Sequence, residues 1–233
     1  TFNCEPHAID IPVDRLEQLE QDDLENAMNE AADQAAEVGA LSHEKAVIDA
    51  ALASVGAGTD TNFTSDTVDP VDVLDAQILN VIKAAGYGSL MSVGVLFGAT
   101  AFQRFKNNAK VRSRVYSGSR PVGRSIADSE VSKLLIGEPG IRTSFMVYDT
   151  TAEGVDASLD FLLDTAILIF ARHDAPTRRD PSFMKTFRLR NQWMVPGVYE
   201  REDGRADVAK YDWSEDIKVT NSSAAARINA TNS

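Results

Sequence analysis

The 233-residue sequence is poor in the side chains that most often build metal and redox sites: it has one cysteine, Cys4, and three histidines. A single cysteine excludes an internal disulfide and leaves no cysteine pair to bind zinc, which fits a reducing compartment. His173 and Asp174 form a pair typical of metal-dependent phosphohydrolases, but His7 and His43 have no second ligand set beside them. We therefore expect no metal site and no cofactor.

Long hydrophobic runs and catalytic motifs are also missing. The best apolar run, residues 166–171, has the length of a strand, whereas a membrane helix needs roughly 20 apolar residues. The sequence has no basic-then-apolar leader, no G-x-S-x-G for an acyl-transfer serine, and no G-x-G-x-x-G after a strand. These absences argue against a membrane partner and secretion, and little in the sequence points to an enzyme.

Basic residues are scarce in the first part of the chain. Residues 1–90 carry 18 acidic and 3 basic side chains, whereas residues 91–233 carry 17 acidic and 20 basic ones. An acidic first part cannot neutralise many phosphates, which argues against tight, nonspecific binding of nucleic acid there. The usual role of an acidic helix face is solubility. The asymmetry also allows unlike ends of neighbouring copies to attract each other.

The sequence does contain a mixture of helical and alternating patterns, which predicts an α+β fold. Residues 2–13 alternate as an extended segment, whose first partner strand we expect upstream of Thr1. Residues 22–52 have apolar residues, mostly alanine, at spacings of three and four, and at Gly39 we expect a kink or a second segment from Ser42. Asp69 and Pro70 predict a capped helix start. The remaining expected elements are a loop at 54–69, helices at 70–86, 99–114 and 130–136, strands at 91–97, 141–148, 165–172, 183–190 and 193–199, and a fraying end at 219–233.

The stretch GSRPVGRS at residues 118–125 is one residue away from the phosphate-binding loop G-x-x-x-x-G-K-[ST]. Such a loop needs a buried strand before its first glycine and a helix at its second, whereas residues 110–117 carry three basic side chains and are unlike a central strand. Arg124 also lacks the compact ammonium group of lysine. We interpret the stretch as a basic surface loop, and a nucleotide-binding protein remains the alternative from a different class.

The most distinctive stretch, residues 172–190, carries six basic and two acidic side chains, with Phe183 and Phe187 between them. Interleaved basic and aromatic residues are typical of nucleic-acid surfaces. In a strand, however, Phe183 and Phe187 would lie on one face, and Arg188 and Arg190 on the other. A strand with an exposed basic edge, suited to an acidic neighbour, explains the pattern more simply.

Taken in order, these segments resemble the major capsid (coat) protein of tailed bacteriophages, which has the Hong Kong 97-type fold. The resemblance rests on CEPHAIDIPVD at residues 4–14 with the acidic, alanine-rich helix after it, on residues 73–86, on residues 93–115 and on residues 169–187. It covers nearly the whole chain through diffuse patterns and not through a catalytic signature. We expect the amino-terminal arm and most of the extended loop of that family to precede Thr1.

The resemblance implies a structural protein with no catalytic turnover. Copies would form the pentamers and hexamers of an icosahedral head that encloses double-stranded DNA in the virion, after assembly in the bacterial cytoplasm. Scaffold, portal or decoration proteins would be further partners, with only weak, nonspecific contact to DNA. Residues 1–69 would hold the end of the extended loop, the spine helix and the start of the peripheral domain, residues 70–164 the axial domain, and residues 165–233 the return strands of the peripheral domain and the tail. An encapsulin-like compartment shares the fold and remains an alternative.

The charge asymmetry then predicts which side chains make contacts between copies. Arginines of the basic stretch would pair with acidic residues of the first helix, and those of the 118–125 loop would lie near a capsomer centre. The expected contact residues are Arg120, Arg124, Arg178, Arg179, Arg188, Arg190, Glu25, Glu30 and Asp33.

Overall fold

A computed structural model describes residues 3–14, 24–86, 92–116, 126–152, 154–175, 177–191, 193–202 and 204–232. The chain divides into two compact units, each built from segments that are far apart in the sequence. The first unit contains residues 1–49 and 185–218, and the second contains residues 50–184 and 219–233.

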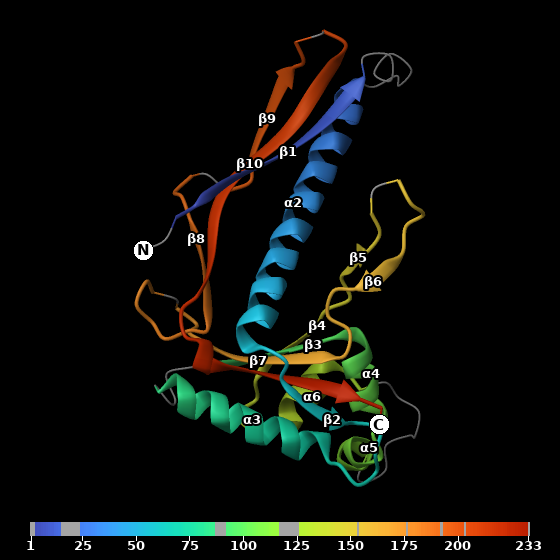
Figure 1. The fold of residues 1–233 in the computed structure, drawn as a ribbon, viewed down its shortest axis with the longest axis vertical. Coiled ribbons are helices and arrows are strands. Elements are labelled where there is room, and N and C mark those ends of the chain that lie inside the picture. The colour runs from blue at the N-terminus through green and yellow to red at the C-terminus, as the bar shows by residue number, and fades with distance from the viewer. Residues whose placement is uncertain are drawn as a thin grey trace. The chain divides into compact units, whose positions relative to one another are not determined.

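The first unit combines one long helix with an antiparallel sheet (Figure 1). Its strands are β1 (Glu5–Asp14), β8 (Met184–Arg188), β9 (Val195–Glu200) and β10 (Ala206–Val219), and most of the helix α2 (Leu24–Val55) belongs to it. β10 pairs with β1 along one edge, from Glu5 opposite Glu215 to Asp14 opposite Ala206. Along its length β10 also pairs with β8 and β9. The described partner of β1 is therefore β10, along one edge, and a further partner strand upstream of Thr1 remains a prediction.

Small side chains let α2 pack closely on this sheet. Ala27 and Ala31 of the helix form a buried cluster with Val13 of β1 and Ala209 of β10. Gly39 does not kink α2, which continues through it as a helix to Val55. The prediction of a kink was wrong because the missing side chain serves close packing, since a Cβ at Gly39 would lie 3.2 Å from the Sδ and Cε atoms of Met194.

The second unit is built on a five-stranded sheet of order β2-β11-β7-β3-β4. Its strands are β2 (Thr59–Asn62), β3 (Ser92–Phe97), β4 (Gly140–Thr143), β7 (Ala166–Arg172) and β11 (Ala225–Thr231). Figure 1 shows α3 (Pro70–Ala85) along one face of this sheet. As predicted, Asp69 caps α3, and its carboxylate accepts a hydrogen bond from the Val71 amide at 3.1 Å. The largest fully buried side chains of the unit include Phe63, Leu74, Ile78, Phe97, Phe105, Ile167, Ile169 and Ile228.

Residues 222–231 form regular structure, contrary to the fraying end that we predicted. After a short 3-10 helix, η2 (Ser222–Ala224), β11 lies in the interior of the sheet, parallel to β2 and antiparallel to β7. Ile228 and Ala230 of β11 are fully buried. The polar composition of residues 219–233 gave no sign of a strand, because only alternate residues of β11 face the core. The small side chain of Ala230 and the branched one of Ile228 suffice to fill the core there.

Two other elements are divided where the sequence predicted continuity. The helix expected at 99–114 is α4 (Ala99–Asn107) followed by α5 (Ala109–Tyr116), and the strand expected at 141–148 is β4 followed by β5 (Val147–Asp149). Asn108 separates the two helices because its buried amide donates to the carbonyl oxygens of Phe63 at 2.9 Å and Ser65 at 3.2 Å. β5 pairs instead with β6 (Leu159–Phe161) in a separate hairpin.

The boundaries of the units also differ from the expected ones at 69/70 and 164/165. The segments 50–69, 165–184 and 219–233 all lie in the second unit together with residues 70–164. These three segments contain β2, β7 and β11. Hydrogen bonds of these strands to one another and to β3 hold the segments in the second unit.

Candidate assembly surfaces

The predicted contact residues are distributed over several segments, and part of the set lies outside the described residues. This part comprises Arg120, Arg124 and the side chain of Glu25. Glu30 and Asp33 are exposed on α2, one turn apart, as the prediction of an acidic contact face requires. Their partners on another copy remain a prediction.

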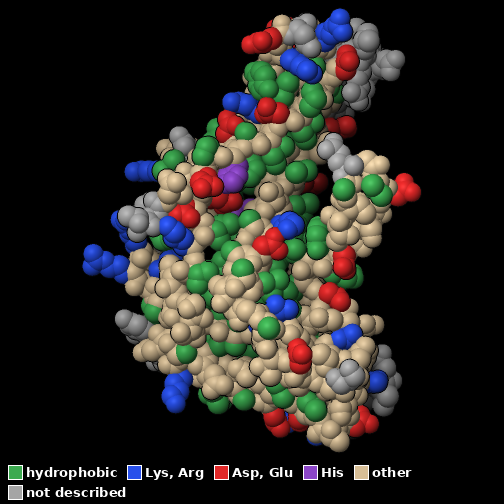
Figure 2. Space-filling view, in the orientation of Figure 1, with side chains coloured by type: hydrophobic (Ala, Val, Ile, Leu, Met, Phe, Trp, Pro, Cys, Tyr) green, Lys and Arg blue, Asp and Glu red, His purple; other side chains and the backbone are tan. Residues whose placement is uncertain are grey.

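Arg178 and Arg179 are exposed on the loop between β7 and β8, which has an ordered polar framework. The Asp180 carboxylate accepts hydrogen bonds from the Thr177 amide at 2.7 Å and from the Ser182 amide at 3.0 Å. The Thr177 hydroxyl oxygen in turn accepts from the Asp180 amide at 3.1 Å. Basic side chains project at the left margin of Figure 2. The loop therefore holds two adjacent guanidinium groups on a defined turn at the surface.

Arg188 has an intramolecular setting that the sequence did not indicate. Its guanidinium lies 3.2 Å from the centre of the Trp193 ring, and one of its nitrogens lies 3.3 Å from Nε2 of His43. Burial lowers the pKa of Arg188, while the charge of Glu215 acts in the opposite direction. Arg188 stacks on Trp193, and both Arg188 and Arg190 are exposed.

Glu215 is the centre of this polar and aromatic network. Its side chain is only 6% exposed, and its two oxygens lie 2.6 Å from Nδ1 of His43 and 3.2 Å from the indole nitrogen of Trp213, which donates to it. The ring of His7 stacks on Trp213 with centroids 5.3 Å apart. The network thus unites both tryptophans and two of the three histidines of the sequence. The rarity of these residue types was the only sequence signal, because four segments distant in the sequence form the site.

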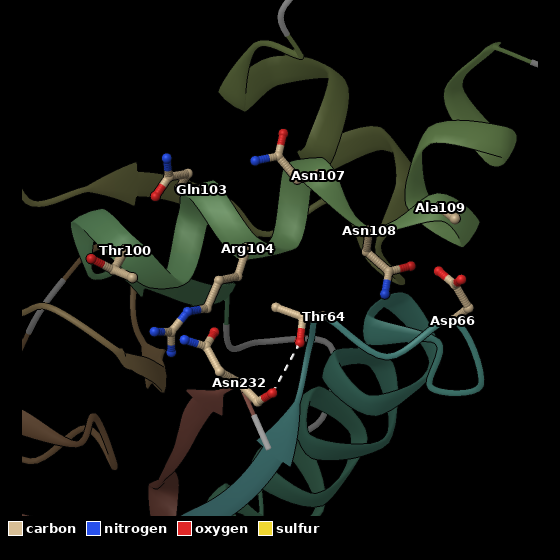
Figure 3. Close-up of a pocket in the computed structure, with 9 residues that line it drawn as sticks. All are labelled: Thr64, Asp66, Thr100, Gln103, Arg104, Asn107, Asn108, Ala109 and Asn232. Atoms are coloured by element: carbon tan, nitrogen blue, oxygen red, sulfur yellow. Dashed lines mark hydrogen bonds between the residues drawn. The ribbon is translucent and has the colours of Figure 1, made fainter.

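A polar pocket of about 360 Å³ lies in the second unit, where α4 and α5 meet the β2 loop and the end of the chain. Figure 3 shows Arg104 pointing toward Asn232, and the Thr64 hydroxyl donates to the Asn232 carbonyl oxygen at 3.3 Å. Arg104 also donates to the carbonyl oxygen of Ala230. These bonds tie the end of β11 to α4, so we interpret the pocket as a structural joint.

Metal and membrane sites receive no support from the described parts of the chain. In these segments, no group of three or more His, Cys, Asp and Glu side chains could hold a metal ion. Within the same residues, no helix is both long and apolar enough to cross a membrane.

Residues 118–125, with the pattern of a phosphate-binding loop, lie outside the described residues. They follow α5 and precede α6 (Asp128–Leu134), so the described element before them is a helix. A phosphate-binding loop instead follows a strand. The flanking structure therefore argues against a nucleotide site.

The sequence matches no protein-family model. No curated protein matches it either. Its structure is similar to that of a phage-related protein from Bordetella bronchiseptica, over 98% of this chain and 76% of that one, with a TM-score of 0.77 and 16% identity. The capsid of the cyanophage P-SCSP1u aligns over 100% of this chain and 74% of that one, with a TM-score of 0.61 and 11% identity.

An encapsulin complex from Synechococcus elongatus is also similar, over 98% of this chain and 73% of that one, with a TM-score of 0.55 and 13% identity. Nearly every residue of the chain takes part in each of these three alignments. The expected α+β architecture is therefore confirmed, and the chain has the Hong Kong 97-type capsid fold.

Proposed function

We propose that this chain is a structural shell subunit, the major capsid protein of a tailed phage, with no catalytic turnover. The observation that supports this most strongly is the likeness to the phage-related protein, which extends over 98% of the chain. A shell subunit acts through geometry, because one fold makes repeated heterologous contacts that close into rings. Pentamers and hexamers of this chain would then form an icosahedral head around double-stranded DNA.

The two units supply the parts that such a subunit needs. In this proposal the first unit, with α2 as its spine helix, is the peripheral domain, and the second unit is the axial domain. Assembly would take place in the bacterial cytoplasm, with scaffold, portal or decoration proteins as partners. Contact with the packaged DNA would be weak and nonspecific, since the chain carries a net charge of -12.

The contents of the particle distinguish this proposal from an encapsulin-like compartment, which the similarity to the encapsulin keeps open. Particles would be purified from the producing cells, treated with nuclease and analysed for DNA and for copurified protein. We expect nuclease-protected double-stranded DNA. Particles that hold an enzyme and no DNA would instead support the encapsulin alternative.

A labelled ATP assay with Arg124→Ala as control tests the nucleotide-binding alternative, for which we expect no specific binding.

Charge pairing between copies is the second part of the proposal. Arg178 and Arg179 would meet carboxylates such as Glu30 and Asp33 of a neighbour. Reversing both arginines to Glu is expected to block assembly and to leave the circular dichroism spectrum unchanged. The control, Arg112→Glu with Arg142→Glu, makes the same change in net charge at two other exposed arginines. Intact shells from the Arg178 and Arg179 variant would exclude this pairing.

A further inference from the structure

The polar and aromatic network of the first unit places a histidine between two opposite charges. Nδ1 of His43, on α2, lies 2.6 Å from an oxygen of Glu215, and Nε2 lies 3.3 Å from a guanidinium nitrogen of Arg188. Glu215 belongs to β10, and Arg188 is the last residue of β8. The two nitrogens of one ring therefore connect the helix to two strands of the sheet.

The donors and acceptors of these three groups fit one state of the imidazole. A carboxylate only accepts hydrogen bonds and a guanidinium only donates them, so Nδ1 must carry a hydrogen and Nε2 must offer its lone pair. A neutral imidazole has one donor and one acceptor, and this tautomer satisfies both contacts. The partners of His43 thus select the neutral ring with its hydrogen on Nδ1.

A second proton on the ring would reverse the contact with Arg188. A charged imidazole donates through both nitrogens, so its Nε2–H would face the N–H groups of Arg188, with two positive charges side by side. The contact with Glu215 would remain, because Nδ1 still donates to the carboxylate and opposite charges strengthen the bond. Protonation of His43 therefore acts against Arg188 and not against Glu215.

The helix that carries His43 adds little charge beside the ring. The α2 residues one turn before and after His43 are uncharged: Gly39, Ala40, Ala46 and Val47. Glu44 and Lys45 follow His43 directly, and Lys45 is paired with Asp49 on the same helix at 2.5 Å. The residues of α2 that share a face with His43 therefore leave the response to the other elements.

The segments packed against the ring contribute mostly aromatic groups. Trp193, before β9, meets His43 edge to face with centroids 5.1 Å apart, and β10 contributes Trp213 beside Glu215. β1 contributes His7, a second titratable ring, which stacks on Trp213. Among the described contacts of His43 itself, Glu215 and Arg188 are therefore the charged groups.

Arg188 is held by a small number of contacts that it can leave. Its guanidinium lies 3.2 Å from the centre of the Trp193 ring, and the residue is exposed, so solvent is directly accessible to it. A cation–π contact at an exposed site is weak by itself. The hydrogen bond to His43 and the charge of Glu215 therefore help to decide whether Arg188 stays on the ring.

We propose that His43 is a pH-sensitive switch, which holds Arg188 on Trp193 when the imidazole is neutral and releases the guanidinium to the surface when it is protonated. Histidine is the side chain whose charge ordinarily changes between about pH 5 and 8. Arg188 is one of the arginines predicted to contact a neighbouring copy, so its release would supply a contact charge as the pH falls. This last consequence rests on the proposed shell function, whereas the switch itself does not.

NMR of the wild-type chain, labelled at histidine and arginine, tests the switch without any substitution. Protons of Arg188 that lie over the Trp193 ring have ring-current-shifted signals. As the pH is lowered from about 8 to about 5, these signals should move to unshifted positions with the same midpoint as the His43 ring signal. The signals of Arg190, an exposed arginine two residues away, should not follow that midpoint. Arg188 signals that stay shifted after His43 is protonated would overturn the switch.

The coupling must also appear in reverse, because an interaction between two sites is reciprocal. Removing the positive charge in Arg188→Ala should raise the pH at which His43 titrates by at least about 0.5 of a pH unit at low ionic strength. Arg190→Ala is the matched control and should leave the titration of His43 unchanged. The same midpoint in Arg188→Ala and wild type would contradict the coupling.

Assembly followed by light scattering against pH tests the consequence for the shell. In His43→Gln the amide can still donate to Glu215 and accept from Arg188, but it does not titrate. We expect wild type to assemble more readily as His43 is protonated, His43→Gln to lose this part of the response, and His173→Gln, in the second unit, to keep it.

The outcomes separate this inference from the proposed function. A full pH response in His43→Gln would exclude the contact role of a released Arg188 and leave the shell function intact. Arg188 signals that stay shifted in the NMR titration would overturn the switch, whether or not the chain assembles. Wild type that assembles at no pH would count against the shell function, and the NMR titration would still decide the switch.

Discussion

Glu215 shows how a single buried carboxylate can organise one unit. Residue-level reasoning from sequence succeeded where the partner is a near neighbour, as with Asp69 and the Val71 amide. It failed at Glu215, whose partner His43 lies on a different segment, because tertiary packing alone brings such groups together.

Replacing Glu215 with Ala is therefore expected to destabilise the protein. The change leaves the buried indole nitrogen of Trp213 without its acceptor and removes the carboxylate beside the ring of His43, which should cost about 1–3 kcal/mol of the free energy of unfolding. Urea unfolding followed by tryptophan fluorescence measures the loss. Glu37→Ala, at an exposed position of α2, is the control and should change stability by less than about 0.5 kcal/mol. Equal stabilities of the two variants would contradict the role of the network.

Asp149 gives a second residue-level prediction, which concerns pH. The Thr151 hydroxyl and amide, and then the Ser158 amide, lower the pKa of Asp149 by hydrogen bonding. The bonds stabilise the hairpin fully above the ordinary Asp pKa of about 3.9, and this stabilisation is lost as the pH falls through the lowered value. Carbon NMR titration should therefore give a higher Asp149 pKa in Thr151→Ala than in wild type. Thr150→Ala should leave it unchanged, because that hydroxyl donates to Ser158. The same pKa in all three proteins would refute the assignment.

At the level of elements, the sequence predicted the strands and helices in which apolar side chains alternate or recur at regular spacing. β3 and β7 agree with their predicted ranges to within a residue, and Phe102 and Phe105 lie on the buried side of α4 as expected. The interruption at Asn108 and the burial of β11 were not predictable, because both depend on hydrogen bonds to segments distant in the sequence.

The packing around two glycines also depends on segments distant in the sequence, and the two positions allow a paired test. A Cβ at Gly98, between β3 and α4, would collide with the carbonyl oxygens of Leu163 and Asp164, which are backbone atoms. Gly98→Ala should therefore destabilise by about 1–3 kcal/mol. Gly39→Ala meets only the flexible end of Met194 and gains up to about 1 kcal/mol of helix propensity, so we expect little loss. Urea midpoints compare the two variants, and equal stabilities would contradict the close approach at Gly98.

At the scale of the whole molecule, the fold was predictable from the resemblance, but the division into units was not. The resemblance implied boundaries near residues 69 and 164. The structure instead returns β7 and β11 to the sheet of the middle segment, because hydrogen bonds between strands, and not chain order, define a unit.

The contact residues are predicted only as classes of charge. Arg178 and Arg179 are exposed on a turn, and their contacts with another copy remain a prediction. The exposed hairpin apolar residues escaped notice because apolar residues in strands usually face a core. Only the register and the exposure of the β5–β6 hairpin reveal a face without a partner.

Electron microscopy of the purified chain over a range of protein concentrations tests the central claim most directly. The account predicts rings of five or six copies, or closed shells of uniform diameter, that appear as the concentration rises. Monomers at every concentration and salt condition, from a protein with a native circular dichroism spectrum, would contradict the assignment of a shell subunit.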